Sequence, residues 1–154
     1  MDNNRILNIE ILSGKGNLEE LLTLFSQGYS QLELDIALEN ALAYSQIKVA
    51  EYLLSLGAKF SNYDYQGVYW AVHNNELEGL KFAIENGVDV NVNNGMPINV
   101  SIITTLNTKS FELINWLLLN GADVNLLTES NLEILKRFGE EKLKTLINSR
   151  RNVT

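Results

Sequence analysis

Apolar residues recur along the chain at helical spacing, in four similar runs that each end at a glycine. The runs close at Gly28, Gly57, Gly87 and Gly121, which are 29, 30 and 34 residues apart. A residue without a Cβ is favoured where the backbone turns left-handed after the last turn of a helix. A recurring period of this length is typical of repeat proteins. We therefore expect each run to be a helix that stops at its glycine.

A second helix is predicted upstream of each run, because another apolar stretch precedes it across a short polar turn. The stretches cover residues 6–12, 34–43, 68–73 and 98–103, and the turns cover 14–17, 44–46, 74–76 and 106–110. The predicted unit is therefore helix, turn, helix, loop. A fifth helix pair is expected over 132–138 and 141–147, entered through Thr128 as N-cap. Its basic outer residues predict a polar cap over the last repeat.

The ends of the last two units resemble the ankyrin repeat. Residues 86–91 (NGVDVN) and 120–125 (NGADVN) match the end-of-repeat signature of that family, and residues 96–99 (MPIN) stand where it usually has Thr-Pro-Leu-His. The resemblance implies one all-α domain over 1–154, an ankyrin-type helix-turn-helix repeat solenoid with short finger loops. Its repeats would cover 4–31, 32–61, 62–92 and 93–126, with capping helices over 127–149. The extra residues 104–109 predict a bulged turn in the fourth repeat.

Composition narrows the classes of function. The 154 residues are 45% apolar and 20% charged, which is typical of a folded chain. The net charge is -7, and residues 1–135 hold 6 basic and 17 acidic residues. An acidic chain gains no counterion-release affinity for nucleic acid or for anionic membranes, so we expect neither as a partner. The acidic body favours a protein with a basic surface.

Cysteine and histidine usage excludes several kinds of site. The chain has no cysteine and a single histidine, His73. Disulfides, thiol catalysis, cysteine-ligated metals and multi-histidine metal sites are therefore excluded. We expect no cofactor. With no leader segment or membrane-spanning run visible in the sequence, we expect a soluble, cytoplasmic monomer.

Candidate binding residues follow from the repeat alignment. A shift of 30 places first-helix residues in ladders, and Glu10 joins the second ladder by a shift of 29. The ladders are Asp35 with Tyr65; Glu39 with Tyr69 and Asn99; and Ala43 with His73 and Ile103. Positions 65, 69 and 73 would share one helical face if the helix included Tyr65.

The expected partner surface is an aromatic patch beside an acidic one. The aromatic residues are Tyr63, Tyr65, Tyr69 and His73, and the acidic ones are Asp35 and Glu39. The ankyrin resemblance implies that this face is the concave one, which that family uses for partners together with its finger loops. Exposed tyrosines are common binding hot spots. The alternative is structural, with Tyr69 bonded within the stack and Tyr63 packed under its own loop.

Catalytic alternatives have little support in the sequence. Residues 14–16 (GKG) lack the spacing of a phosphate-binding loop, and they fall in a predicted turn. His73 has acidic neighbours in Asp64 and Glu76, yet no nucleophile or oxyanion donor accompanies them. We expect a non-catalytic protein-protein interaction module that binds on the concave face and finger loops. Two alternatives stay open: a small acidic immunity or inhibitor-type protein that neutralises a basic toxin or enzyme, and a small-molecule binder or enzyme with a pocket around His73.

Overall fold

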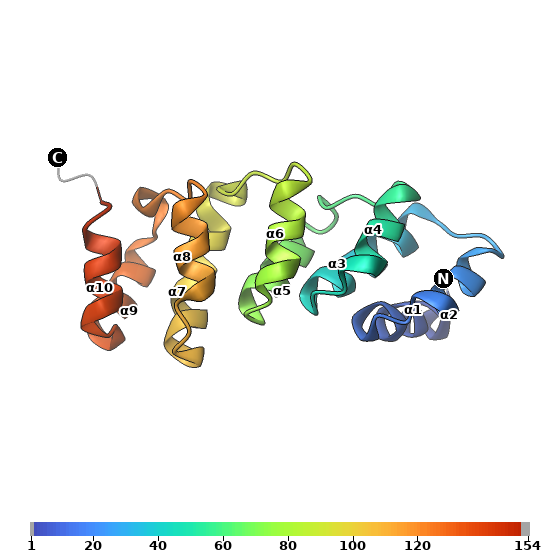
Figure 1. Ribbon diagram of the computed structural model, residues 1–154, viewed down its shortest axis with the longest axis horizontal. Coiled ribbons are helices and arrows are strands. Elements are labelled where there is room, and N and C mark those ends of the chain that lie inside the picture. Colours follow the sequence, from blue (N-terminus) through green and yellow to red (C-terminus); the bar gives the residue numbers. More distant parts are fainter. Residues whose placement is uncertain (1, 152–154) are drawn as a thin grey trace. The chain divides into compact units, whose positions relative to one another are not determined.

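The computed structural model describes residues 2–151, and every regular element in that part of the chain is helical. It contains ten α-helices and one short 3-10 helix, and no strand occurs among residues 2–151 (Figure 1). The prediction of an all-α chain is confirmed. Contacts within the chain divide it into two compact units, Met1–Val88 and Asp89–Thr154, which we call unit 1 and unit 2.

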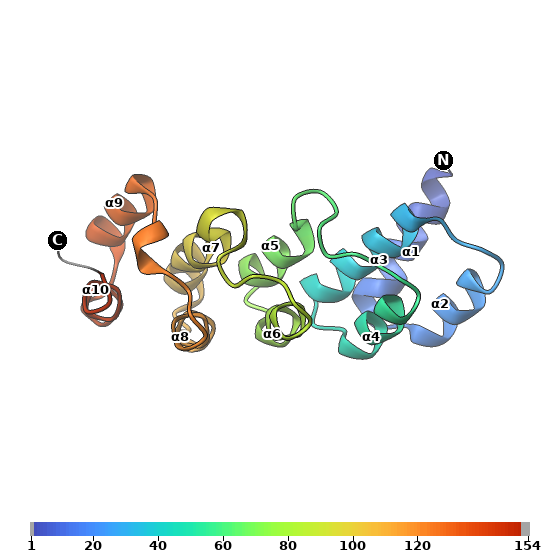
Figure 2. The same ribbon diagram turned by 90° about the horizontal axis from the view of Figure 1, so that it is seen from above.

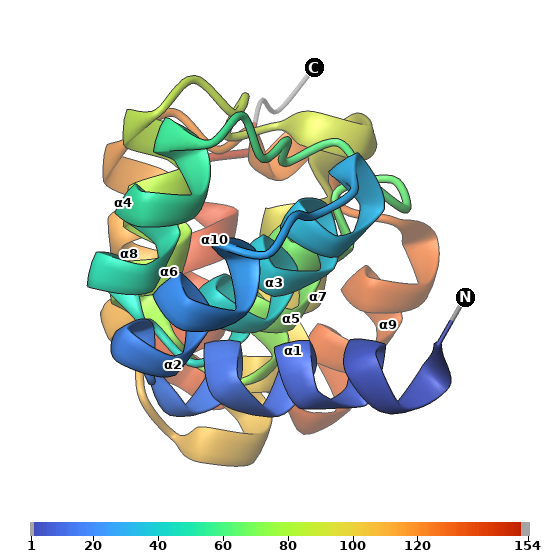
Figure 3. The same cartoon turned by 90° about the vertical axis from the view of Figure 1, so that its right-hand side faces the viewer.

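Unit 1 is built from three helical hairpins. Its helices are α1 (Asn3–Lys15), α2 (Leu18–Phe25), α3 (Gln31–Ala43), α4 (Ile47–Ser55), α5 (Gln66–His73) and α6 (Leu77–Glu85). The first helices of the hairpins pack side by side, α1 on α3 and α3 on α5. Figure 2 shows these three in one row and α2, α4 and α6 in a second row. In the end-on view of Figure 3, α4 and α6 lie to the left of α3 and α5. Unit 1 therefore has two helical layers.

The core of unit 1 lies between these layers. Leu38 and Leu42 of α3, Leu53 of α4 and Leu80 of α6 are almost completely buried. Burying a leucine side chain contributes about 1.5–3 kcal/mol relative to leaving it exposed. Close approach of α5 to α3 depends on Gly67, because a Cβ there would lie 2.9 Å from the Cα of Glu39. This glycine brings the first turn of α5 directly against the middle of α3.

Unit 2 contains two further hairpins. Its elements are α7 (Val92–Thr108), α8 (Glu112–Leu119), the 3-10 helix η1 (Val124–Leu126), α9 (Glu129–Phe138) and α10 (Glu141–Asn148). The Thr128 hydroxyl accepts a hydrogen bond from the Asn131 amide, which confirms Thr128 as the N-cap of α9. Within the unit, α7 packs on α8 and on α9.

The prediction of a bulged turn over residues 104–109 is wrong. Helix α7 continues to Thr108 and ends at Lys109, whose φ is 61°. The hydroxyls of Thr104 and Thr108 donate to carbonyl oxygens four residues earlier, on Val100 and Thr104. Thr104 and Thr105 are also buried, so they pack as helix residues instead of forming a loop. The extra residues of this repeat lengthen its first helix.

The repeat period is visible in the backbone. Gly28, Gly57, Gly87 and Gly121 have φ values of 109°, 96°, 104° and 94°, which confirms the left-handed turns predicted there. The turns within the first four hairpins also contain one left-handed residue each. These residues are Gly16, Ser45, Asn75 and Lys109, at φ values of 74°, 54°, 58° and 61°. They are again 29, 30 and 34 residues apart, although no residue type recurs among them.

A second repeated feature precedes α5 and the regular part of α7. Tyr63, Asp64 and Tyr65 are all left-handed, with φ values of 46°, 51° and 62°. Residues 93–95 are left-handed as well, at 51°, 56° and 86°, and they stand 30 positions later. The condition for Tyr65 to share a helical face with Tyr69 and His73, that the helix includes it, is not met. Tyr65 is the N-cap of α5, outside its helical turns, because the left-handed segment delays the start of the helix.

Charge is divided unequally between the units. Residues 1–88 hold 5 basic and 12 acidic residues, whereas residues 89–154 hold 7 of each. The whole formal charge of -7 therefore belongs to unit 1. None of the helices described over residues 2–151 combines the length and apolar character that crossing a membrane requires.

Candidate functional site

Two buried carboxylates of α3 hold the loop between α4 and α5. Asp35 Oδ1 accepts hydrogen bonds from the Lys59 backbone amide at 2.7 Å and from Gln31 Nε2 at 2.8 Å. Glu39 Oε1 accepts one from Asn62 Nδ2 at 2.7 Å. Their exposed fractions are only 6% and 8%. Asp35 and Glu39 are therefore buried against the loop that follows α4 and do not form an open acidic surface, although Glu39 also lines a pocket.

Burial and neighbouring charge disfavour the ionised form of Glu39. Desolvation raises the pKa of its carboxyl, the Asn62 hydrogen bond lowers it in part, and the carboxylates of Asp35 and Glu10 raise it further. The net direction is upward from the ordinary value of 4.5. No ion pair described over residues 2–151 includes any of the three acids. The acids of α1 and α3 form an uncompensated negative site.

Some of the predicted aromatic residues come together on α5. The rings of Tyr69 and His73 are stacked, with centroids 5.8 Å apart and an interplanar angle of 12°. Tyr63 lies in the preceding loop with 60% of its surface exposed. Tyr65 is half-buried at the entrance to α5. The predicted patch of four residues is therefore a stacked pair on the helix and two separate tyrosines in the loop.

A third ring, that of Trp70, completes this group. Its centroid lies 5.1 Å from that of Tyr69 and 5.2 Å from that of His73, edge to face in both cases. We call Tyr69, Trp70 and His73 the α5 aromatic cluster. Edge-to-face and offset arrangements are favourable for aromatic pairs, so the cluster fixes the orientation of the indole. The Trp70 side chain remains 38% exposed.

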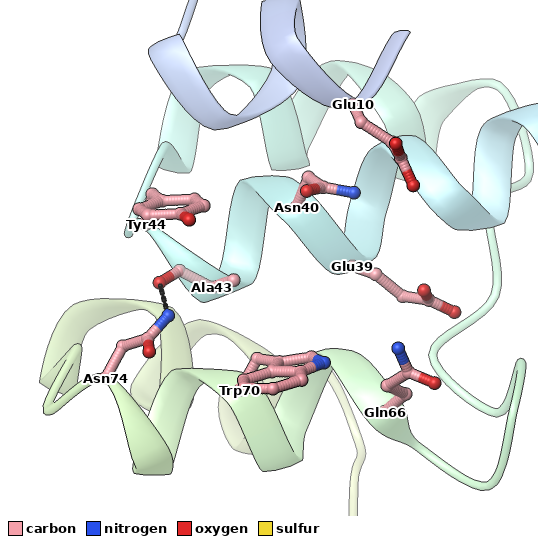
Figure 4. Close-up of a pocket in the computed structure, with 8 residues that line it drawn as sticks. All are labelled: Glu10, Glu39, Asn40, Ala43, Tyr44, Gln66, Trp70 and Asn74. Atoms are coloured by element: carbon pink, nitrogen blue, oxygen red, sulfur yellow. Dashed lines mark hydrogen bonds between the residues drawn. The ribbon is translucent and has the colours of Figure 1, made fainter. Parts of the chain in front are cut away.

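Trp70 lines a pocket formed by α1, α3 and α5. Its cavity volume is about 280 Å³, and its walls are Glu10, Glu39, Asn40, Ala43, Tyr44, Gln66, Trp70 and Asn74. Figure 4 shows the Glu10, Glu39 and Gln66 head groups gathered at one end, with Tyr44 and Asn74 at the other. Asn74 Nδ2 donates to the Ala43 carbonyl at 3.0 Å and ties α5 to α3 there. We refer to this site as the α1–α3–α5 pocket.

An apolar cavity adjoins this pocket. It has a volume of about 350 Å³ and shares Glu10, Asn40 and Tyr44 with the first. Leu7 and Ile11 add apolar surface, and these two side chains are 54% and 44% exposed. Contiguous exposed apolar surface beside polar groups is typical of interaction sites. A ligand in the α1–α3–α5 pocket can therefore continue onto the apolar side of α1.

The repeat alignment contained a signal for the residues that the sequence analysis missed. A shift of 30 relates Asn40 to Trp70 and Tyr44 to Asn74, and all four line the pocket. The predicted ladder ran through Glu10, Glu39 and Tyr69, one helical position away from Asn40 and Trp70. Tyr69 supports the indole instead of lining the pocket. The adjacent ladder therefore adds Asn40 and Trp70 to Glu10 and Glu39, which belong to the predicted ladder and line the same pocket.

Other chemistry finds little support in the described residues. His73 is exposed and does not line the α1–α3–α5 pocket. No group of three or more potential metal ligands occurs within residues 2–151. In unit 2, a cavity of about 410 Å³ between α9 and α10 has both acidic and basic walls, including Glu133 and Lys144. That cavity has no charge preference comparable to the one in unit 1.

No protein-family model matches this sequence, and no curated protein is significantly similar to it. Function is therefore inferred from the pocket and its surroundings.

Proposed function

We propose that the chain is an ankyrin-type repeat protein with four repeats and a terminal helix pair. The support is the agreement between two independent series of left-handed residues. One series closes the loops at Gly28, Gly57, Gly87 and Gly121, and the other lies within the hairpin turns, with identical spacings of 29, 30 and 34. A repeat that retains its backbone while its side chains change behaves as one structural unit of a repeat array.

The function that we propose is non-catalytic binding of a partner protein through the face formed by α1, α3 and α5. The observation that carries this proposal is the α1–α3–α5 pocket, in which exposed aromatic rings lie beside carboxylates that have no cationic partner within residues 2–151. Aromatic side chains provide large contact area at low entropic cost. The charge of -7 on unit 1 favours a basic partner, because complementary charge accelerates encounter. A basic toxin or enzyme is one such partner.

A binding role accounts for these residues better than a catalytic one does. His73 stacks on Tyr69 at the surface and lies outside the pocket. A general acid or base needs to reach a bound substrate at hydrogen-bond distance. The pocket itself presents carboxylates, amides and rings, with no nucleophile beside a base. These groups can recognise a side chain without transforming it.

Affinity capture with matched baits tests this function. The wild-type chain, the double variant Tyr69→Ala/Trp70→Ala and the variant Glu51→Lys would each be immobilised and exposed to a lysate of the native source. Glu51 is exposed on α4, in the other helical layer, so it serves as the charge-changing control. We expect a protein that the wild type and the control retain and that the double variant loses.

The affinity of that protein should then be measured with purified components. Truncating two clustered aromatic contacts is expected to weaken binding by about 30-fold or more. Circular dichroism spectra of the variants should match that of the wild type. If all three baits retain the same proteins with equal affinity, the binding face lies elsewhere on the molecule.

A further inference from the structure

The groups that line the α1–α3–α5 pocket suit a cationic ligand. Glu10 and Glu39 approach one end of it from two different helices, and Asp35 lies one turn before Glu39 on α3. Asn40 and Gln66 add side-chain amides whose oxygens are further acceptors. Uncompensated carboxylates that face one another repel, and a cation between them would remove that repulsion. The charges around the pocket therefore favour a positively charged ligand.

Two aromatic rings of the pocket favour the same ligand. Trp70 and Tyr44 line it from α5 and from the end of α3, with exposed fractions of 38% and 53%. A cation held over an aromatic face within about 6 Å is attracted by the ring quadrupole, and tryptophan is the best ring for this contact. The α5 aromatic cluster keeps the indole in place. Figure 4 shows Trp70 on the opposite wall of the pocket from Glu10.

The size of the pocket limits how much of a ligand can enter. Its volume of about 280 Å³ is just below the range of about 300–1,000 Å³ that is usual for small-molecule sites. A space of this size admits one long side chain, and the adjoining apolar cavity admits the residues beside it. Resting on the proposed function, we infer that the α1–α3–α5 pocket receives the guanidinium group of an arginine in the partner protein.

Arginine suits this arrangement better than lysine. Its planar head group has five N–H donors in a fixed fork, and it stacks on aromatic rings while bonding to carboxylates. Lysine has a compact charge with three donors, and it is more strongly hydrated. Acceptors at one end of the pocket and rings along its walls match the fork and the flat face of a guanidinium. The adjoining apolar cavity favours a polypeptide as the source, since it gives the residues beside the arginine a surface to contact.

Nuclear magnetic resonance titration with a short peptide tests this inference. The probe is an acetylated, amidated pentapeptide with arginine at its centre and glycine elsewhere. We expect saturable shifts of the Trp70 indole N–H and of the Glu39 and Asn40 backbone amides. A matching peptide with citrulline, which has the same shape without the charge, should bind at least about tenfold more weakly. A lysine peptide should fall between the two.

Variants of the full chain separate a specific site from general charge attraction. Glu39→Gln removes a charge and keeps an oxygen that can accept from Asn62, so the loop contact persists. This variant and Trp70→Leu should each weaken arginine peptide binding by about tenfold. Glu51→Gln, on the other helical layer, should leave it unchanged. Equal binding of the arginine and citrulline peptides, or equal weakening in all three variants, would overturn the inference.

Two further results show whether the guanidinium group comes from a protein or a small molecule, and whether a failure concerns the arginine inference or the proposed binding function. Arginine amide should bind more weakly than the peptide. If it binds as tightly, the pocket takes a small guanidinium compound and the assignment to a protein partner is overturned. If no peptide binds but affinity capture still depends on Tyr69 and Trp70, the arginine inference fails while the proposed binding function stands. If the peptide binds and no bait captures a protein through this face, the proposed function fails instead.

Discussion

Glu39 in unit 1 and Asn99 in unit 2 occupy equivalent positions in the repeat, yet they serve their loops differently. The two residues stand 60 positions apart, on α3 and on the regular part of α7. Within residues 2–151, Glu39 accepts a single hydrogen bond, from Asn62. Asn99 donates to the carbonyls of Gly95 and Leu126 and accepts from the Thr128 amide and from Asn131 Nδ2, all at 2.8–2.9 Å.

The difference shows what each side chain is suited to do. A side-chain amide has two N–H donors and an oxygen with two lone pairs, so the four bonds of Asn99 use its full capacity. A carboxylate has no donor and carries a charge that is costly to bury. Asparagine is thus the better residue for fastening a loop. Glu39 carries a negative charge that is not needed to hold the loop. This charge lies beside a pocket that is lined by aromatic rings.

Removing the side chain of Asn99 should have the largest effect on stability. In Asn99→Leu, four hydrogen bonds are lost, and the amide of Thr128 and the carbonyl of Leu126 lose their partner. We expect the free energy of unfolding to fall by about 3 kcal/mol. Urea denaturation followed by circular dichroism measures this. The control is Asn107→Ala at an exposed position of α7, which should change stability by less than about 0.5 kcal/mol.

Placing a carboxylate at position 99, as unit 1 has at position 39, should also lower the stability of the protein. In Asn99→Asp, the carboxylate keeps both acceptor contacts but faces the carbonyl oxygens of Gly95 and Leu126 without a donor. We expect a loss of about 2 kcal/mol at pH 7. The loss should shrink at pH 3, because a protonated carboxyl can donate one of the missing bonds. A loss that is equal at both pH values would contradict this account of the site.

The two asparagine donors should differ in importance. Asn62→Ala removes the hydrogen bond of a buried carboxylate, whereas Asn131→Ala removes one of four bonds to a neutral amide. We expect losses of about 1.5 and about 1 kcal/mol respectively, since bonds to charged groups are the stronger ones. The pKa of the Glu39 carboxyl should rise further in Asn62→Ala. Thermal unfolding and a carbon-13 titration of the carboxyl measure the two effects, and an unchanged pKa would mean that Asn62 does not stabilise the anion.

Neutralising Glu39 should have the smallest effect, and its sign depends on pH. Burial, together with the facing carboxylates of Asp35 on α3 and Glu10 on α1, raises the pKa of Glu39 above its ordinary value of 4.5. The stability that protonation contributes is present below that value and is lost as the pH rises through the folded-state pKa. Glu39→Gln should therefore match the wild type at pH 4.

At pH 7 the same variant should be more stable than the wild type, by up to about 1 kcal/mol. Melting temperatures of both proteins at the two pH values measure the difference. A variant that melts below the wild type at pH 7 would show that the charge itself stabilises the loop. In that case, the contrast with Asn99 would be smaller than their hydrogen bonds indicate.

Backbone features were the most predictable from the sequence. The four glycines predicted where the second helices stop, and Thr128 predicted the start of α9, because each residue type has a strong local preference. The turn residues Ser45 and Lys109 were not predictable in this way. Neither type favours a left-handed backbone, so tertiary packing imposes their conformation.

The site was less predictable, since it depends on which way a side chain faces. Asp35 and Glu39 were placed on the correct helix, but both are buried against donors far along the chain. The Lys59 amide, 24 residues later, bonds to Asp35, and the Asn62 side chain, 23 residues later, bonds to Glu39. Trp70 was not among the predicted binding residues, although it stands beside Tyr69 in the sequence. A single helical step separates a face that packs from a face that binds. The side of α5 that faces the pocket depends on where the left-handed segment over residues 63–65 ends, which the sequence does not show.

The left-handed residues also bear on how the chain is able to evolve. Eight non-glycine residues in the described part adopt positive φ, including the segment over residues 63–65. Four of them are asparagine or aspartate, which tolerate this region, and at each of the other four glycine would remove a backbone penalty of about 1 kcal/mol. Glycine at Ser45, Tyr63, Tyr65 or Lys109 is therefore a stabilising substitution that leaves every residue lining the pocket unchanged. Such substitutions would let the lining of the pocket drift toward new partners without loss of the folded state.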